Sequence, residues 1–155
     1  MRILFGVSSS KFFHVQELVK ALEKFQIECK LVFDQDYADG YPSRKIGNWF
    51  PSNQKFKKLV DEFKPDVIFI DRQRHFGLQA SKTKIPLLMQ LRGDYWKETE
   101  MARQTLYKSF PKSLALDKWE EIGKVCFEGS KVILPLCNYL KEIVKNHYPD
   151  KPSEI

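Results

Sequence analysis

The residues that could do chemistry follow short apolar runs, and the first such group lies at the N-terminus. It consists of Gly6, Ser8, Ser9, Ser10 and His14. Serine hydroxyls beside the start of a helix form a site that can bind anions. The segment contains neither the G-x-G-x-x-G dinucleotide pattern nor the G-x-x-x-x-G-K-[ST] phosphate loop, which argues against a dehydrogenase and a P-loop NTPase. His14 would either face the ligand or cap the helix at the surface.

A second group, L-R-G-D-Y-W, follows the fourth apolar run. Arg92 could bind a phosphate with its fork of donors, and Gly93 would allow the backbone to approach a ligand closely. Asp94 could accept a proton or a sugar hydrogen bond, which makes it a candidate catalytic residue together with His14. Tyr95 and Trp96 could stack on a sugar or a base. The alternative is an Arg92–Asp94 ion pair beside two core aromatic residues.

A third polar group, D-R-Q-R-H, follows the third apolar run at residues 71–75. It contains two arginines, and Arg72 is a candidate ligand-binding residue. Most of the segment is equally compatible with a solvated loop.

The elements that must position these groups alternate along the chain. Continuous apolar runs predict buried strands, and apolar residues at helical spacing predict amphipathic helices. The predicted strands are 2–7, 28–34, 67–70, 86–91 and 131–134, and the predicted helices are 15–25, 54–63, 76–82 and 113–128, with a further helix within 93–111. Residues 35–53 are predicted to form a long loop, and Gly129 is predicted to be a C-cap.

Strands that alternate with helices predict an α/β fold, a Rossmann-like three-layer α/β/α sandwich with a mostly parallel sheet. Residues 1–155 fit a single domain. Ligands of such folds lie beyond the carboxyl ends of the strands, where all three polar groups fall. Residues 131–155 read as a strand, a helix and the start of another strand, so we expect this chain to be one half of a larger enzyme.

Composition and charge restrict the possible partners. The chain has a net charge of +6 and a pI near 9.2, which favours anionic partners such as nucleotides, phosphorylated lipids or anionic membranes. It lacks a recognisable nucleic-acid recognition element, so we expect no nucleic-acid partner. Three widely spaced cysteines offer no metal-ligand spacing. No apolar run could span a membrane or serve as a signal peptide, which predicts a cytoplasmic protein.

In this order, the segments resemble the N-terminal domain of group 1 glycosyltransferases of the retaining, GT-B type. Residues 1–33 look like the first strand, loop, helix and second strand of that family, and KPDVIFIDRQ looks like its third strand. IPLLMQLRGDYW resembles its fourth strand and the following loop, and residues 131–155 resemble its closing strand and helix. The chain departs from the family where serines replace a Gly-Gly pair, where Arg92 replaces a histidine and where Cys137 replaces a serine.

The resemblance implies sugar transfer from a nucleotide-sugar to an acceptor held by this half. Residues 6–14 would lie near the donor diphosphate, His14 and Arg92 would line the cleft, and Asp94 and Trp96 would contact sugar or acceptor. Cys137 and Asn138, at the start of the last helix, would also bind the substrate. The acceptor would be a glycan or a lipid-linked molecule. The basic, aromatic stretch 41–58, with Trp49, Phe50 and Phe56, could rest on an anionic membrane or on a lipid-linked acceptor. The alternative is a mobile loop with partly buried aromatic residues.

The C-terminal domain of that family carries a Glu-x7-Glu pattern and binds the nucleotide-sugar donor, and nothing in this sequence replaces it. The resemblance therefore implies that this chain has no cofactor of its own and is inactive without that partner domain. The alternative is a solitary Rossmann-like module that binds a nucleotide or another anion without catalysis.

Overall fold

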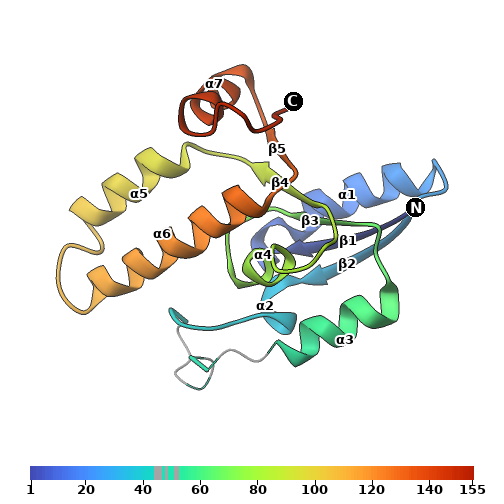
Figure 1. Ribbon diagram of the computed structural model, residues 1–155, viewed down its shortest axis with the longest axis horizontal. Coiled ribbons are helices and arrows are strands. Elements are labelled where there is room, and N and C mark those ends of the chain that lie inside the picture. The colour runs from blue at the N-terminus through green and yellow to red at the C-terminus, as the bar shows by residue number, and fades with distance from the viewer. Residues whose placement is uncertain (44–46, 48, 51–52) are drawn as a thin grey trace.

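The computed structural model describes residues 1–43, 47, 49–50 and 53–155 (Figure 1). Strands and helices alternate as the sequence predicts. They are β1 (Arg2–Val7), η1 (Ser9–Lys11), α1 (Phe12–Glu23), β2 (Glu28–Phe33), α2 (Asp34–Tyr37), α3 (Gln54–Phe63), β3 (Val67–Ile70), α4 (His75–Ala80), β4 (Leu87–Leu91), α5 (Tyr95–Gln104), α6 (Lys112–Gly129), β5 (Val132–Pro135) and α7 (Asn138–His147).

Within the described residues, the strands form one parallel sheet of five in the order β2-β1-β3-β4-β5. The inner strand β1 pairs on both edges, with Phe5 opposite Leu31 of β2 and opposite Phe69 of β3. The chain passes from β1 to β2 and then returns to the other side of β1, so the topological switch point lies between β1 and β3. The predicted Rossmann-like α/β fold is confirmed.

A further parallel pairing begins at the outer edge of β5. Ser153 forms an isolated parallel bridge with Ile133. The Ile133 N–H donates to the carbonyl of Pro152 at 3.0 Å, and the Glu154 N–H donates to the carbonyl of Ile133 at 3.1 Å. The predicted start of another strand is therefore present as one bridge beside β5.

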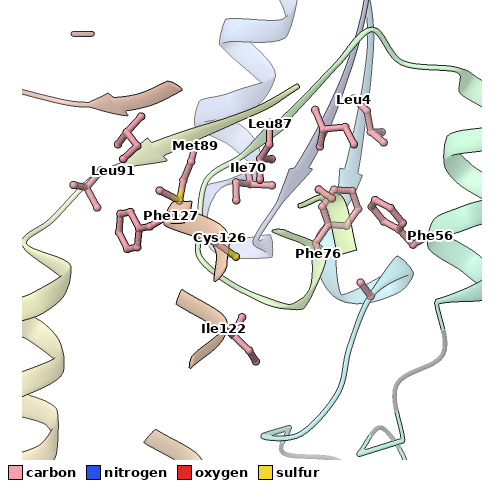
Figure 2. Packing of buried hydrophobic residues seen from close by; sticks show 14 of the residues in the cluster. Leu4, Phe56, Ile70, Phe76, Leu87, Met89, Leu91, Ile122, Cys126 and Phe127 are labelled. Carbon is pink, nitrogen blue, oxygen red and sulfur yellow. The ribbon is translucent and has the colours of Figure 1, made fainter. Parts of the chain in front are cut away.

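Helices cover both faces of the sheet. The larger core packs α3, α4, α6 and α7 against one face (Figure 2). Its centre includes Phe76, whose ring lies edge-on to Phe56 with centroids 5.0 Å apart. On the other face, α1 buries Val15 and Val19 in a smaller cluster with Phe5 and Phe69. Strands buried on both faces explain why the sequence shows continuous apolar runs.

The spacing of apolar residues predicts one buried face for the first helix, and this prediction is partly wrong. The predicted face consists of Val15, Leu18, Val19, Leu22 and Phe25. The helix spans Phe12–Glu23 and buries Val15 and Val19, whereas Leu18 and Phe25 are exposed. Phe25 lies beyond the helix, in a turn where Gln26 adopts a φ of 61°. The chain reverses there toward β2, so helical spacing no longer decides which way Phe25 points.

Three smaller predictions also need correction. The predicted loop 35–53 is interrupted at its start by α2, a single helical turn. Gly129 is the last residue of α6 and not its C-cap, because Ser130 takes that position with an extended backbone. A side chain at Gly129 would overlap Ser81, so close packing explains this glycine. Leu136, predicted on the buried face of the last helix, precedes α7 and is exposed.

Candidate functional site

Asp71 ties the first and third strands together at their carboxyl ends. Its carboxylate accepts the backbone N–H of Ser8 at 3.1 Å and the Ser8 hydroxyl at 3.0 Å. Asp34 follows β2 as the first residue of α2, is buried, and accepts the N–H of Gln35 at 2.8 Å. Burial, and then the nearby Asp71 carboxylate, raise the pKa of Asp34. Side chains of the protein therefore occupy the switch point itself, and the Ser8 hydroxyl is already hydrogen-bonded to Asp71.

The main cavity lies next to the switch point, beyond the carboxyl ends of β3 and β4. Its volume is about 530 Å³. The loop after β3 and the end of β4 form its floor, and α5 and α6 form a wall. Figure 1 shows these two helices as a hairpin that extends away from the sheet. The cavity is thus placed where parallel α/β sheets bind ligands.

Four cationic side chains line this cavity: Lys11, Arg72, Arg74 and Arg92. None of them forms an ion pair within 4.0 Å with a carboxylate of the described residues. Burial, and then the neighbouring Arg72, lower the pKa of Arg74. Asp71 and Glu98 are acidic residues in the lining. The cavity therefore has an excess of positive charge.

Two polar atoms of the cavity lining are buried without a hydrogen-bond partner among the described residues. They are Nε of Arg92 and Oε1 of Gln90, both from the end of β4. A buried donor without a partner is unfavourable, and more so when it carries charge. An anionic ligand in the cavity would supply the acceptor that Arg92 lacks.

Aromatic contacts hold Arg74 at the cavity wall. Its guanidinium lies over the ring of Trp119 in α6, 5.2 Å from the centroid. His75 packs edge-on against the same ring at 5.2 Å, and its Nε2 lies 3.0 Å from the carbonyl of Tyr41. Burial lowers the pKa of His75, so the neutral ring donates from Nε2 to that carbonyl. Arg74 is therefore positioned in advance of any ligand.

The segment after β4 divides between the cavity and the start of α5. Gly93 lines the cavity, and a side chain there would overlap Glu98. Asp94 is the N-cap of α5 and accepts the N–H of Lys97 at 3.1 Å. Its other carboxylate oxygen accepts the Tyr139 hydroxyl at 3.4 Å. No ion pair joins Arg92 and Asp94 in the described part of the chain, so the ion-pair half of that alternative is wrong, whereas Tyr95 and Trp96 do pack against the larger core.

Trp96 lies in an aromatic stack outside the cavity. Its ring lies between Phe127, at 5.0 Å, and His147, which is parallel to it at 3.9 Å. Tyr95 lines the cavity and donates its hydroxyl to the Trp119 carbonyl at 3.3 Å. Burial, and then Glu120, raise the pKa of Tyr95 to about 12, so its hydroxyl stays protonated. Trp96 therefore joins α5 to α6 and α7.

The structure brings only part of the predicted site together. Arg72, Arg92 and Gly93 line the cavity, and Ser8 contacts its lining residue Asp71. Nine predicted residues do not line the cavity: Gly6, Ser8, Ser9, Ser10, His14, Asp94, Trp96, Cys137 and Asn138. Gly6 faces Phe76 in the core, and Ser9, Ser10, His14, Cys137 and Asn138 are exposed. The roles proposed for these residues stay predictions.

Sequence reasoning missed Lys11, Gln90 and Trp119 as members of the site. Lys11 follows the three serines that were singled out, and its charge was the available signal. Gln90 is a polar residue within an apolar strand, which also could have been noticed. Trp119 comes from α6. The helical spacing placed this residue on the apolar side of the helix but did not indicate that it lines a cavity.

The basic, aromatic stretch 41–58 is only partly within the described residues. Arg44 and Lys45 lie outside them. Phe50 is exposed, but Phe56 is buried in the larger core against Phe76, so Phe56 cannot contact a membrane. Trp49 is partly exposed and donates its indole N–H to the Ser43 carbonyl at 2.9 Å.

Two further features are absent from the described part of the chain. No group of three or more His, Cys, Asp or Glu residues there could hold a metal ion. None of the helices described there has the length and apolar character needed to cross a bilayer.

Comparisons with known proteins reveal a likeness in fold. No family model matches the chain, and no curated protein matches its sequence. The crystal structure of Glycyrrhiza uralensis UGT73P12 complexed with glycyrrhetinic acid 3-O-monoglucuronide is similar, with a TM-score of 0.50 and 16% identity. The likeness covers 98% of this chain and 41% of that chain. This likeness shows that the chain shares its fold with part of that protein.

Proposed function

We propose that this chain is the acceptor-binding half of a glycosyltransferase, of the group 1 GT-B type that the sequence resembles. It would hold an anionic glycan or lipid-linked acceptor while a separate domain supplies a nucleotide-sugar donor. The fold likeness to part of UGT73P12 supports a two-domain arrangement. The main support within this chain is the cavity at the carboxyl ends of β3 and β4.

The observation that carries the proposal is the group of cations in that cavity. Arg72, Arg74 and Arg92 come from the ends of two neighbouring strands, and Arg92 Nε has no partner among the described residues. Guanidinium groups bind phosphate and carboxylate oxygens with paired, charge-assisted hydrogen bonds. A phosphate-bearing or carboxylate-bearing acceptor would satisfy these donors with charge-assisted hydrogen bonds, whereas the hydroxyl oxygens of a neutral sugar would accept weaker ones.

Chemistry at the sugar would require the donor-binding domain. Asp94 caps α5, and His14 lies on an exposed part of α1, so neither faces the cavity. We expect the chain alone to bind the acceptor and not to transfer sugar. His14 would contribute only if the donor domain brings the diphosphate to the exposed start of α1.

A solitary anion-binding module is the second candidate. It is favoured by the same cations, because a cavity lined by Lys11 and three arginines needs no second domain to bind an anion. The two functions differ in what they require: sugar transfer needs a donor domain, and a module does not.

Acceptor-type binding can be tested on the chain itself by calorimetry with inorganic pyrophosphate and with geranyl phosphate. Arg92→Gln should raise the Kd by about 10- to 100-fold, the loss expected for a charge-assisted hydrogen bond. Arg2→Gln is the matched control, since Arg2 pairs with Glu28 at the opposite end of the sheet. Equal affinities of wild type and Arg92→Gln would overturn the cavity as the binding site.

The choice between the two functions needs the coding sequence that follows Ile155. An in-frame second Rossmann-like domain, or a separate partner chain that carries one, would support the transferase. In that complete enzyme, Arg92→Gln should raise KM for the acceptor more than it lowers kcat, and His14→Ala should reduce transfer. A stop codon, with no partner recovered, would favour the binding module.

A further inference from the structure

The far end of the α5–α6 hairpin exposes a group of large apolar side chains. They are Met101 (58% exposed), Leu106 (71%), Phe110 (77%) and Leu114 (48%). Met101 belongs to the last part of α5, Leu114 to the first turn of α6, and the other two to the connection between them. Single exposed apolar residues are common, but here they gather in one short segment.

The hairpin presents this segment at a projecting end of the molecule. Figure 1 shows α5 and α6 running side by side away from the sheet, with their connection at the lower left. We call residues 101–114 the hairpin tip. A projecting tip can insert into the surface of a lipid bilayer, whereas the contact with a protein partner would more often be made by a groove or a flat face of this domain.

The charges in the connection between α5 and α6 and in the first turn of α6 have one sign. The acidic Glu100, directly before the tip, accepts a hydrogen bond from Gln104. Between Thr105 and Leu116, the chain contains Lys108 and Lys112 and no acidic residue. Arg103 contacts both Asp117 and Glu120 on the neighbouring helix, so these acidic groups are already paired with a cation. The tip therefore combines exposed apolar groups with two lysines, the combination that favours the interface of an anionic bilayer.

We propose that the hairpin tip docks the protein on a lipid bilayer that contains anionic lipids. Leu106 and Phe110 enter the boundary between headgroups and acyl chains, and Lys108 and Lys112 contact lipid phosphates. This surface differs from the stretch 41–58 considered from the sequence. The inference holds whether or not the chain takes part in sugar transfer.

The same hairpin connects the tip to the cavity. Tyr107, within the tip, and Leu116, one turn further along α6, both line the cavity. Docking through the tip therefore brings this part of the cavity lining close to the membrane surface. If the proposed function holds, the anionic ligand would be the phosphate of a membrane-borne acceptor.

Vesicle co-sedimentation of the whole chain tests the proposal directly. The probes are vesicles of phosphatidylcholine alone and of equal parts phosphatidylcholine and phosphatidylglycerol. We expect binding to the anionic vesicles at low salt. Phe110→Asp together with Leu106→Asp should abolish it, and Lys108→Gln together with Lys112→Gln should reduce the partition coefficient by more than about tenfold.

Phe25→Asp is the matched control, since Phe25 is 76% exposed but follows α1 at the opposite end of the strands. All of the substituted side chains are exposed, so circular dichroism melting curves should coincide.

Failure of the wild type to bind anionic vesicles, or equal binding by the Asp variant, would overturn the proposal. A wild-type dimer in analytical ultracentrifugation that Phe110→Asp dissociates, without vesicle binding, would assign the tip to a second copy and also overturn it. Calorimetry with pyrophosphate tests the cavity separately, so the two proposals can fail independently.

Discussion

Asp34 is a buried carboxyl group whose ionisation is unfavourable in the folded protein. Its pKa is raised above the ordinary value of 3.8, first by burial and then by Asp71. A raised pKa means that the folded state holds the proton more tightly than the unfolded state does. The free energy of unfolding therefore falls as pH rises from the unfolded pKa to the folded pKa, and it remains reduced above that range.

Asp34→Asn should remove this pH-dependent cost. We expect the variant to gain in unfolding free energy relative to wild type between pH 3 and pH 7, because the asparagine side chain cannot ionise but can still accept from Gln35. Urea denaturation at a series of pH values measures the difference. Asp36→Asn, an exposed position of the same helix, is the control and should change stability little. If the free energies of unfolding of Asp34→Asn and wild type differed by the same amount at every pH in this range, the raised pKa of Asp34 would be contradicted.

Gly6 provides a second residue-scale prediction. A Cβ at this position would overlap the ring of Phe76, which is fully buried and in contact with Phe56. Gly6→Ala should therefore destabilise the protein by about 1–3 kcal/mol through overpacking. Equilibrium urea denaturation measures this loss, with Gly47→Ala as control because nothing lies within 4 Å of a Cβ there. Equal losses in both variants would show that the Phe76 contact is not the cause.

At the scale of elements, Trp96 is the residue that joins α5 to the rest of the domain. It stacks on Phe127 of α6 and on His147 of α7. Trp96→Ala should lower the free energy of unfolding by about 3 kcal/mol, and Trp96→Phe should restore part of it. Pyrophosphate affinity should change much less than in Arg92→Gln. A stable Trp96→Ala variant that has lost ligand affinity would instead support the role predicted from the sequence.

The sequence predicted strands better than helix faces. Runs such as residues 3–7 and 67–70 are apolar throughout because both faces of those strands are covered. The face of α1 was less predictable, because the spacing continues to Phe25 although the helix ends at Glu23. Which residue terminates a helix depends on where the following strand must begin, and spacing within the helix carries no such information.

The site was predictable to the extent that it lies at strand ends. Arg72 and Arg92 were found because the residues after parallel strands meet at one edge of a sheet. Trp119 and Tyr107 were not found, because they reach the cavity from a hairpin whose packing angle is set by contacts such as Trp96 with Phe127. Asp94 and Trp96 share a sequence motif with Arg92 but turn away from the cavity to begin α5.

At the scale of the whole molecule, the reactivity of the three cysteine thiols measures how accessible each part of the folded structure is to solvent. Burial raises the pKa of Cys126 to about 12, whereas Cys137 is exposed at the start of α7. A thiol-specific reagent at pH 8 should label Cys137 rapidly, Cys29 more slowly and Cys126 only on unfolding. Counting labelled thiols against urea concentration gives the measurement. Rapid labelling that persists in Cys137→Ser would show that a second thiol is accessible in the native state.

The inner position of β1 has a consequence for synthesis on the ribosome. The strand is made first, yet its two edges pair with β2 and with β3. Its apolar run therefore leaves the exit tunnel with both hydrogen-bonding edges open, and the edge that pairs with β3 stays open until residues 67–70 have also emerged. Over that interval, the nascent chain depends on chaperones or on early packing against α1 to keep an unpaired strand from aggregating.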